Sequence, residues 1–335
     1  IAPDEQREIE TVAHTSKHQR VATSLPAEIA RLVDLAHLVS AEDHTYRDHT
    51  RANLEAALVA MLVAFPVYRA YVVPGEEPPQ TSVQTVDGVV DACAAEQPHL
   101  RDELAYLREL ALGRLGARET GKRAEFAVRF QQTCGPVMAK GVEDTTFYRW
   151  HRLSALNEVG GRHEQFAVFP DELHAWASRQ QDEHPLSMTT LSTHDTKRSE
   201  DVRARILALS EVPEAWREAV TGWRDAASAY RSAGGWPDPV TEYLLWQTVV
   251  GTWPISADRL TEYLTKAARE AKLHTTWTDP DPDYEEALAA FATGVLSDAT
   301  IAESIGAFVE QIQPWARVTT LGSKLVQLML PGAPD

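Results

Sequence analysis

The stretch STHDTKRSED, residues 192–201, decides how the fold of this chain is interpreted. An apolar entry precedes this stretch, and a polar, charged run follows the pair His194 and Asp195, so we expect a strand to end over residues 188–194. The run from Val202 to Leu209 is typical of a helix that leaves such a loop. The sequence therefore predicts a His-Asp pair at the carboxyl end of a strand.

Helical patterns fill most of the remaining sequence. Apolar residues recur at helical spacing between residues 24 and 65, around residues 100–110, and over much of the chain after residue 205. The run from Pro66 to Pro74 breaks this period with β-branched and aromatic residues between prolines, which predicts a short strand over 66–73. The closing run from Gly322 to Leu330 predicts a helix that passes into a buried strand over 325–330.

Strands that are widely separated by helical insertions, with polar motifs at their carboxyl ends, match a (β/α)8 barrel, which carries its chemistry on that face. The predicted fold class is α/β: part of a (β/α)8 TIM barrel with large, mainly helical insertions, mostly α by content. Because the chain lacks an initiator Met and stops after an apolar run, we interpret it as an excised piece. The expected segments are a helical insertion (1–64), a barrel strand followed by helices (65–130), a barrel segment with both polar motifs (131–205), a second helical insertion (206–320) and the last barrel helix and strand (321–335).

The composition argues against several classes of function, among them nucleic-acid binding and membrane association. With 335 residues and 44% hydrophobic content, the chain can bury a large core, in one domain or two. Its net charge of −17 argues against a nucleic-acid surface and suits a neutral partner such as a glucan.

No apolar run approaches the ~20 residues that span a bilayer, and the N-terminus lacks the regions of a signal peptide, so we expect no membrane association and a cytoplasmic protein. Cys93 and Cys134 have no ligand-type neighbours at metal spacing, so we expect reduced thiols, no metal and no cofactor.

A second polar block is MAKGVEDT, residues 138–145, followed by FYR at 147–149 and LNEVGG at 156–161. Its lysine, carboxylates and tyrosine suit sugar binding, because an aromatic face takes the apolar side of a pyranose ring and charged groups take its hydroxyls. The spacing leaves a structural alternative open. Lys140 stands three residues before Glu143 and four before Asp144, which is typical of a salt-bridged helix face.

Together the two blocks closely resemble maltooligosyl trehalose synthase, a family of the α-amylase superfamily (glycoside hydrolase family 13). The chain looks like the C-terminal half of the catalytic region of that family. The resemblance implies an isomerase of trehalose biosynthesis, a glucosylmutase that moves the reducing-end glucose of a maltooligosaccharide from an α-1,4 to an α,α-1,1 linkage. It also implies a maltooligosaccharide as the substrate and a trehalose-releasing hydrolase in the same pathway as a partner.

The resemblance also assigns roles to residues. Asp195 would bind the hydroxyls of the reacting glucose and stabilise its oxocarbenium-like transition state, with His194 donating a further hydrogen bond to the same sugar. The alternative for Asp195 is the cap of a helix start. Lys197 and Arg198 would fix sugar hydroxyls, or else lie on a solvated surface. Lys140 is assigned to substrate binding by the same resemblance.

Further candidates for substrate binding are Tyr148, Glu143, Asn157, Glu158 and Arg69. Trp277, beside an acidic loop, is a candidate for stacking on sugar, although scattered tryptophans are more often core anchors. Glu158 is not expected to be the general acid, because in this superfamily the acid and the nucleophile lie on earlier barrel strands. We expect both of these carboxylates upstream of Ile1, and we expect this chain alone to be inactive.

Two other functions stay open at this stage. An α-amylase-type glucan hydrolase usually has Asn before the His-Asp pair, whereas this chain has Thr193. A non-catalytic helical binding module would account for the amphipathic helices, but it leaves both polar blocks unexplained.

Overall fold

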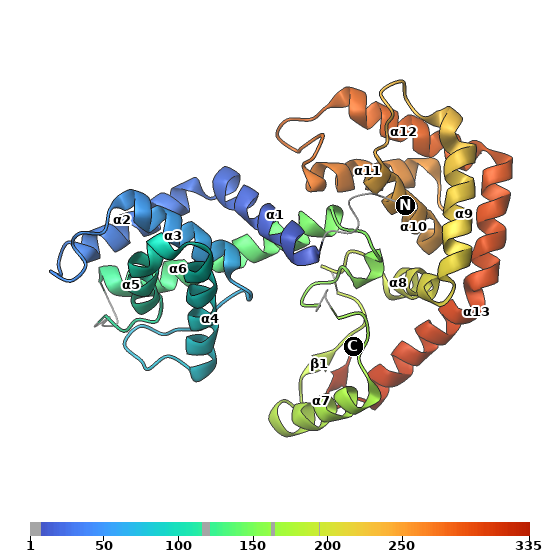
Figure 1. The fold of residues 1–335 in the computed structure, drawn as a ribbon. Helices are drawn as coiled ribbons and strands as arrows, with labels where there is room; N and C mark the ends of the chain where they lie inside the picture. The colour runs from blue at the N-terminus through green and yellow to red at the C-terminus, as the bar shows by residue number, and fades with distance from the viewer. Residues whose placement is uncertain (1–7, 116–120, 162–164, 194) are drawn as a thin grey trace. The chain divides into compact units, whose positions relative to one another are not determined.

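The structure, a computed structural model, is built almost entirely from helices (Figure 1). It describes residues 8–115, 121–161, 165–193 and 195–335. Contacts divide the chain into two compact units. We call residues 10–146 the N-terminal unit and residues 147–335, with residues 8 and 9, the C-terminal unit. The mostly helical content predicted from the sequence is confirmed.

The N-terminal unit is a helical bundle around α3, Arg51–Ala64. Its other helices are α1 (Ile9–Ser24), α2 (Pro26–Ser40), α4 (Gln80–Glu96), α5 (Arg101–Ala111) and α6 (Lys122–Met138). Because α2, α4, α5 and α6 all contact α3, its Leu54, Leu58 and Met61 have no exposed surface. The helices predicted between residues 24 and 65 are confirmed, with a loop between α2 and α3.

The strand predicted over residues 66–73 is wrong, because these residues form a loop. Gln131 of α6 supplies the hydrogen bonds that a neighbouring strand would make. Its Oε1 accepts from the backbone N of Val72 at 2.8 Å, and its Nε2 donates to the carbonyl of Val72 at 2.9 Å. The composition of this run is β-like, but a strand forms only where a second strand pairs with it, and here a side chain satisfies the backbone.

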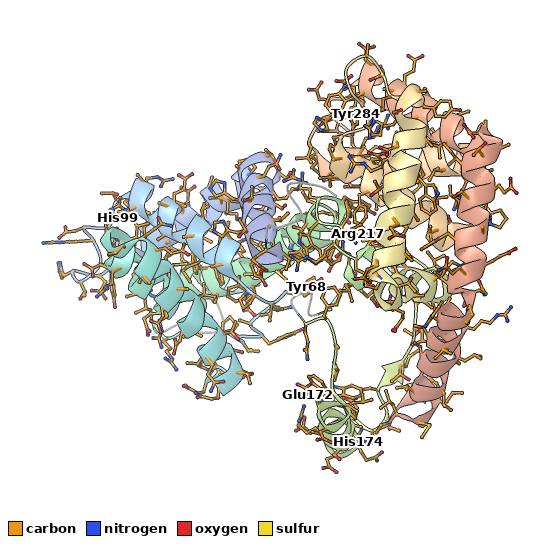
Figure 2. The ribbon with its side chains drawn as sticks, turned by 45° about the vertical axis from the view of Figure 1, so that its right-hand side comes forward. Tyr68, His99, Glu172, His174, Arg217 and Tyr284 are labelled. Atoms are coloured by element: carbon orange, nitrogen blue, oxygen red, sulfur yellow. The ribbon has the colours of Figure 1, made fainter. Side chains whose placement is uncertain are left out.

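The C-terminal unit consists mainly of helices, and some of them are joined by long irregular segments such as residues 272–281 (Figure 1). Its helices are α7 (Pro170–Glu183), α8 (Glu200–Leu207), α9 (Pro213–Ala226), α10 (Pro239–Thr252), α11 (Ala257–Ala271), α12 (Pro282–Ser297) and α13 (Ala299–Met329). No residue of α7 is buried; its Glu172 and His174 are labelled in Figure 2. The helices predicted after residue 205 are present.

The core of the C-terminal unit surrounds α10, in which every residue from 242 to 251 is buried. Trp246 of α10 lies 5.5 Å from Trp223 of α9, measured between ring centroids, and both indoles are buried. The carboxylate of Glu242 is also buried, because it pairs with Arg224 and Arg231 and accepts a hydrogen bond from the Trp246 indole. A helix that is buried on all sides can keep such a charge only where partners satisfy it.

A short parallel pair of strands, β1 (Met188–Thr189) and β2 (Ala333–Pro334), joins residues that are far apart in the sequence. Met188 pairs with Ala333, and the Ala333 N–H donates to the Ser187 carbonyl at 2.9 Å. Gly332 permits this approach: its φ is 126°, and a Cβ there would lie 2.5 Å from the Ser187 carbonyl oxygen. The strand predicted at 188–194 is therefore present, although it is shorter than expected.

The buried strand predicted at residues 325–330 is wrong, because α13 continues to Met329. Its apolar residues stay at helical spacing, and strand pairing starts only after Gly332. In the part of the chain that the structure describes, no single helix is long and apolar enough to cross a membrane. The bent pair of α12 and α13, which meet at 74°, reaches that length and composition only together.

We expect Gln131→Leu to lower the free energy of unfolding of the N-terminal unit by about 2–4 kcal/mol, because each buried backbone group left unpaired costs about 1–3 kcal/mol. Chemical denaturation would measure this change. Gln132→Leu is the matched control: Gln132 is the next residue of α6 and is exposed, so its change should stay within about 0.5 kcal/mol. Equal stabilities of the two variants would contradict the role given to Gln131.

Candidate functional site

The C-terminal unit contains a cleft of about 810 Å³. Several residues predicted from the sequence to bind substrate line this cleft: Tyr148, Asp195, Lys197 and Arg198. The other lining residues are Thr196, Ser199, Val202, Thr248, Thr252, Ile255, Arg259, Glu262, Tyr263, Thr265, Lys266, Arg269 and Trp277. The tertiary structure thus gathers the charged residues after β1 with polar residues of α10 and α11.

A tight turn presents Asp195 to the cleft. The backbone N of Thr193 donates to the Thr196 hydroxyl at 2.7 Å, and the backbone N of Asp195 donates to the Thr193 hydroxyl at 3.2 Å. The Asp195 side chain is exposed. Ser199 holds the N-cap position of α8, so the interpretation of Asp195 as the cap of that helix is wrong. His194 lies outside the described residues.

Arg198 attaches this turn to the rest of the C-terminal unit. Its guanidinium donates to the Tyr263 hydroxyl of α11 at 2.8 Å and to the Ser154 carbonyl at 3.4 Å. The Ser154 segment is in turn held by the buried amide of Gln247 on α10, which accepts from the Ser154 N–H at 2.8 Å and donates to the His151 carbonyl at 2.7 Å. Arg198 is therefore a half-buried structural tether as well as a lining residue of the cleft.

Lys197 lies over the ring of Tyr148, with its Nζ 6.0 Å from the ring centroid. Tyr148 is only 7% exposed and packs with Leu244, Ala267 and Ala271. The ring therefore offers little open face to a sugar. Its position supports the Lys197 ammonium by a cation–π contact at the edge of the cleft.

One wall of the cleft is a polar stripe of α11 that the sequence analysis missed. The stripe consists of Arg259, Glu262, Tyr263, Lys266 and Arg269. These positions recur at helical spacing opposite the buried face of α11, which includes Leu260 and Leu264. The spacing is visible in the sequence, but it is equally typical of any solvated helix face.

Comparisons with known proteins extend over nearly the whole chain. No family model matches the sequence. A Mycobacterium tuberculosis protein named "Putative maltooligosyl trehalose synthase" is 37% identical over 332 residues, which is 97% of this chain and 39% of that protein. The solved maltooligosyltrehalose synthase of Arthrobacter ramosus is also 37% identical, with a TM-score of 0.82 over 98% of this chain and 39% of that chain.

The chain is related to the maltooligosyl trehalose synthases. The resemblance predicted from the two polar blocks is confirmed. A Sulfolobus tokodaii structure titled as a hypothetical maltooligosyl trehalose synthase, 24% identical with a TM-score of 0.78 over 98% of this chain and 40% of that chain, supports the same fold. The chain spans about 39% of the length of the curated relatives that it matches.

Two predicted residues of the C-terminal unit have structural contacts and do not line the cleft. Asn157 is buried, and its Nδ2 donates to the carbonyls of Phe147 at 3.2 Å and Trp150 at 2.6 Å. Glu158 forms an ion pair of 3.2 Å with Arg203 of α8. Both residues thus shape the segment under the cleft, and their contact with substrate stays a prediction.

The remaining predicted residues belong to the N-terminal unit. Lys140 pairs with Asp144 at 2.7 Å, so the salt bridge that the spacing allows is present; Glu143 lies in the same π-helical turn and is half-buried. Arg69 is exposed and donates to Gln131 at 3.3 Å. Substrate binding by Lys140, Glu143 and Arg69 stays a prediction.

Gly141, between Lys140 and Glu143 in the second polar block, allows the chain to pack closely on α1. A Cβ at this position would lie 2.6 Å from Cγ and 2.9 Å from Cα of Lys17, which is buried on α1. The Lys17 ammonium donates to the Phe65 carbonyl at 2.8 Å, and burial lowers its pKa to about 8. The glycine therefore permits close packing of the π-helical turn on α1.

We expect His151, which is buried beside Arg198, to make the C-terminal unit sensitive to acid. Burial, and then the positive charge of Arg198, lower the pKa of His151 from 6.5 to about 3. Between these values the unfolded chain binds a proton that the folded chain does not, so stability falls as the pH falls below 6.5. At pH 5 the loss should be about 2 kcal/mol relative to pH 7.5.

His151→Phe replaces the imidazole with a somewhat larger aromatic ring that does not titrate, so it should abolish this part of the acid sensitivity. Thermal unfolding of the wild type and the variant at pH 7.5 and pH 5 measures the difference. His174→Phe, at an exposed position of α7, is the control and should follow the wild type. A parallel loss of stability in His151→Phe and in the wild type would show that His151 is not responsible.

Proposed function

We propose that this chain forms part of an enzyme that converts the reducing-end α-1,4 linkage of a maltooligosaccharide into an α,α-1,1 linkage by intramolecular transglucosylation. The observation that carries the proposal is the 37% identity to maltooligosyl trehalose synthases along nearly the whole chain. The cleft adds support, because Asp195, Lys197 and Arg198 line it together with polar residues of α11. The substrate is a neutral glucan whose hydroxyls such side chains can bind.

Asp195 is proposed to stabilise the transition state. Cleavage of an α-glucosidic bond passes through an oxocarbenium-like state, which a fixed carboxylate stabilises more than it stabilises the ground state. Asp195 is exposed on a hydrogen-bonded turn that Arg198 fixes to α11 and to Ser154, so its position is set before the substrate arrives. We assign to no residue of this chain the nucleophile or the proton donor.

Lys197 and Arg198 are proposed to hold sugar hydroxyls next to Asp195. An ammonium group supplies up to three donors and a guanidinium five, and Arg198 spends some of its donors on Tyr263 and Ser154. Lys197, whose ammonium lies above the Tyr148 ring, lines the same cleft, so both side chains are proposed as donors to the substrate. Retention of the released glucose by such donors would favour transfer over hydrolysis.

We also propose that β1 and β2 belong to a (β/α)8 barrel. The two strands are parallel, and a long helical connection joins them, as in neighbouring barrel strands with an insertion between them. Asp195 follows β1 in the chain, and thus lies on its carboxyl side, where barrel enzymes place their chemistry.

We further propose a cytoplasmic location and a trehalose-releasing hydrolase as the pathway partner, both on the family resemblance alone.

We expect Asp195→Asn, in the full-length protein that carries this chain, to reduce kcat about 10²–10⁴-fold with a much smaller rise in KM. The amide keeps the volume and one acceptor oxygen but loses the negative charge that favours the transition state. Kinetics with maltopentaose would measure the effect, with trehalose-type product scored against free glucose.

Asp201→Asn is the matched control, since Asp201 lies in the first turn of α8 and does not line the cleft. Its kcat should stay within a few-fold of the wild type. Near-normal kcat in Asp195→Asn would remove Asp195 from the mechanism. Free glucose as the main product of the wild type would indicate a glucan hydrolase instead of a mutase.

A further inference from the structure

Trp277 differs from the tryptophans that anchor the core. It lies on the loop between α11 and α12 and lines the cleft, with 54% of its surface exposed. Trp216, Trp223 and Trp246 of the same unit are all at least 94% buried, since their exposed fractions are 6%, 3% and 0%. Because Trp277 lines the cleft, a ligand that packs on its exposed surface would remove apolar area from water, which is favourable.

The indole of Trp277 is held in a defined orientation. The guanidinium carbon of Arg269 lies 5.0 Å from its ring centroid, and its Nε1 donates to the Glu270 carboxylate at 2.9 Å. One face of the ring is therefore next to a cation and one edge is fixed by a hydrogen bond. These contacts together act against rotation of the side chain.

The support behind Trp277 is itself rigid. Arg269 donates two hydrogen bonds of 2.7 Å to Glu285 of α12, and Glu285 also accepts from the Thr275 hydroxyl at 2.6 Å. The Thr275 hydroxyl in turn accepts from the backbone N of Asp281 at 3.0 Å. Figure 2 labels Tyr284, the residue before Glu285, at this end of the C-terminal unit. Both ends of the loop are thus tied to the two helices that it joins.

The position of this platform along the cleft indicates what it binds. Arg198, three residues after Asp195, contacts α11 at Tyr263. Arg269, which supports Trp277, is six residues further along the helix, about 9 Å at the rise of an α-helix. Trp277, which Arg269 contacts, therefore belongs to a part of the cleft further along α11 than the contact of Arg198 with Tyr263, and we infer that it lies beyond the sugar that Asp195 would contact.

We propose that Trp277 is a stacking platform for a glucosyl residue remote from the reacting glucose, and that it sets the preference of the cleft for longer maltooligosaccharides. This inference rests on the proposed function, because it takes the substrate to be an α-glucan. A pyranose ring has an apolar face that packs on an indole, and a ring held by Arg269 and Glu270 loses little entropy when the sugar arrives.

The test compares a short with a long substrate. In the full-length protein, Trp277→Ala should raise the Kd and the KM for maltoheptaose about 3- to 10-fold. The values for maltotriose should change less than 2-fold, and kcat should stay near that of the wild type for both. Trp277→Phe should recover most of the loss, because a phenyl ring also offers an aromatic face. Trp315→Ala, at a half-exposed site on α13 away from the cleft, is the control and should match the wild type.

The outcomes separate this inference from the proposed function. If the wild type and the Trp277→Ala variant bind maltoheptaose equally well, the stacking role of Trp277 is overturned. The proposed function then stays intact. An equal loss for maltotriose and maltoheptaose would place Trp277 at the reacting end and would also overturn the remote stacking role. A wild type that binds neither glucan would overturn both proposals.

Discussion

The amide of Gln247 is the interaction on which the candidate site depends. It projects from α10, the helix that is buried on every side, and it bonds both the Ser154 N–H and the His151 carbonyl. Ser154 then accepts from Arg198, which also reaches Tyr263 of α11. A chain of directional bonds thus runs from the apolar core to the turn that carries Asp195. Because the core cannot shift without cost, a loop attached to it in this way keeps its charged side chains in place.

In the N-terminal unit, too, a buried glutamine bonds the backbone of a loop and fixes it to a helix. Gln131 is buried on α6 and satisfies both backbone groups of Val72, so a loop of β-like composition is fixed without a partner strand. Glutamine suits this role because its side-chain amide carries a donor and an acceptor at the spacing of a peptide group. Primary amides, more than strands, hold the irregular segments of this helical chain.

The side chains that line the cleft are mainly positively charged, whereas the chain as a whole carries a net negative charge. The chain carries a net charge of −17, yet five cations line the cleft against two carboxylates: Lys197, Arg198, Arg259, Lys266 and Arg269 against Asp195 and Glu262. The cations supply many donors and little acceptor capacity, which suits a ligand rich in hydroxyl oxygens. In the proposed function, such donors would hold a released sugar until it reacts again.

Patterns that extend over a few residues were enough to predict the helices and the family resemblance. Helical periodicity predicted the helices on both sides of residue 205, and two local blocks of polar residues predicted the family to which the comparisons relate the chain. The tertiary structure decided what depends on distant partners. Residues 66–73 did not become a strand because Gln131 meets their backbone, and residues 325–330 stayed in α13 because pairing with β1 begins only after Gly332. It also decided which polar residues share a cleft. Asn157 and Tyr148 are both substrate-binding candidates in the sequence, but Tyr148 lines the cleft, whereas the buried Asn157 donates to two backbone carbonyls. The polar stripe of α11 faces the cleft because the opposite, apolar face of that helix packs into the core, and the spacing alone does not reveal what the stripe faces.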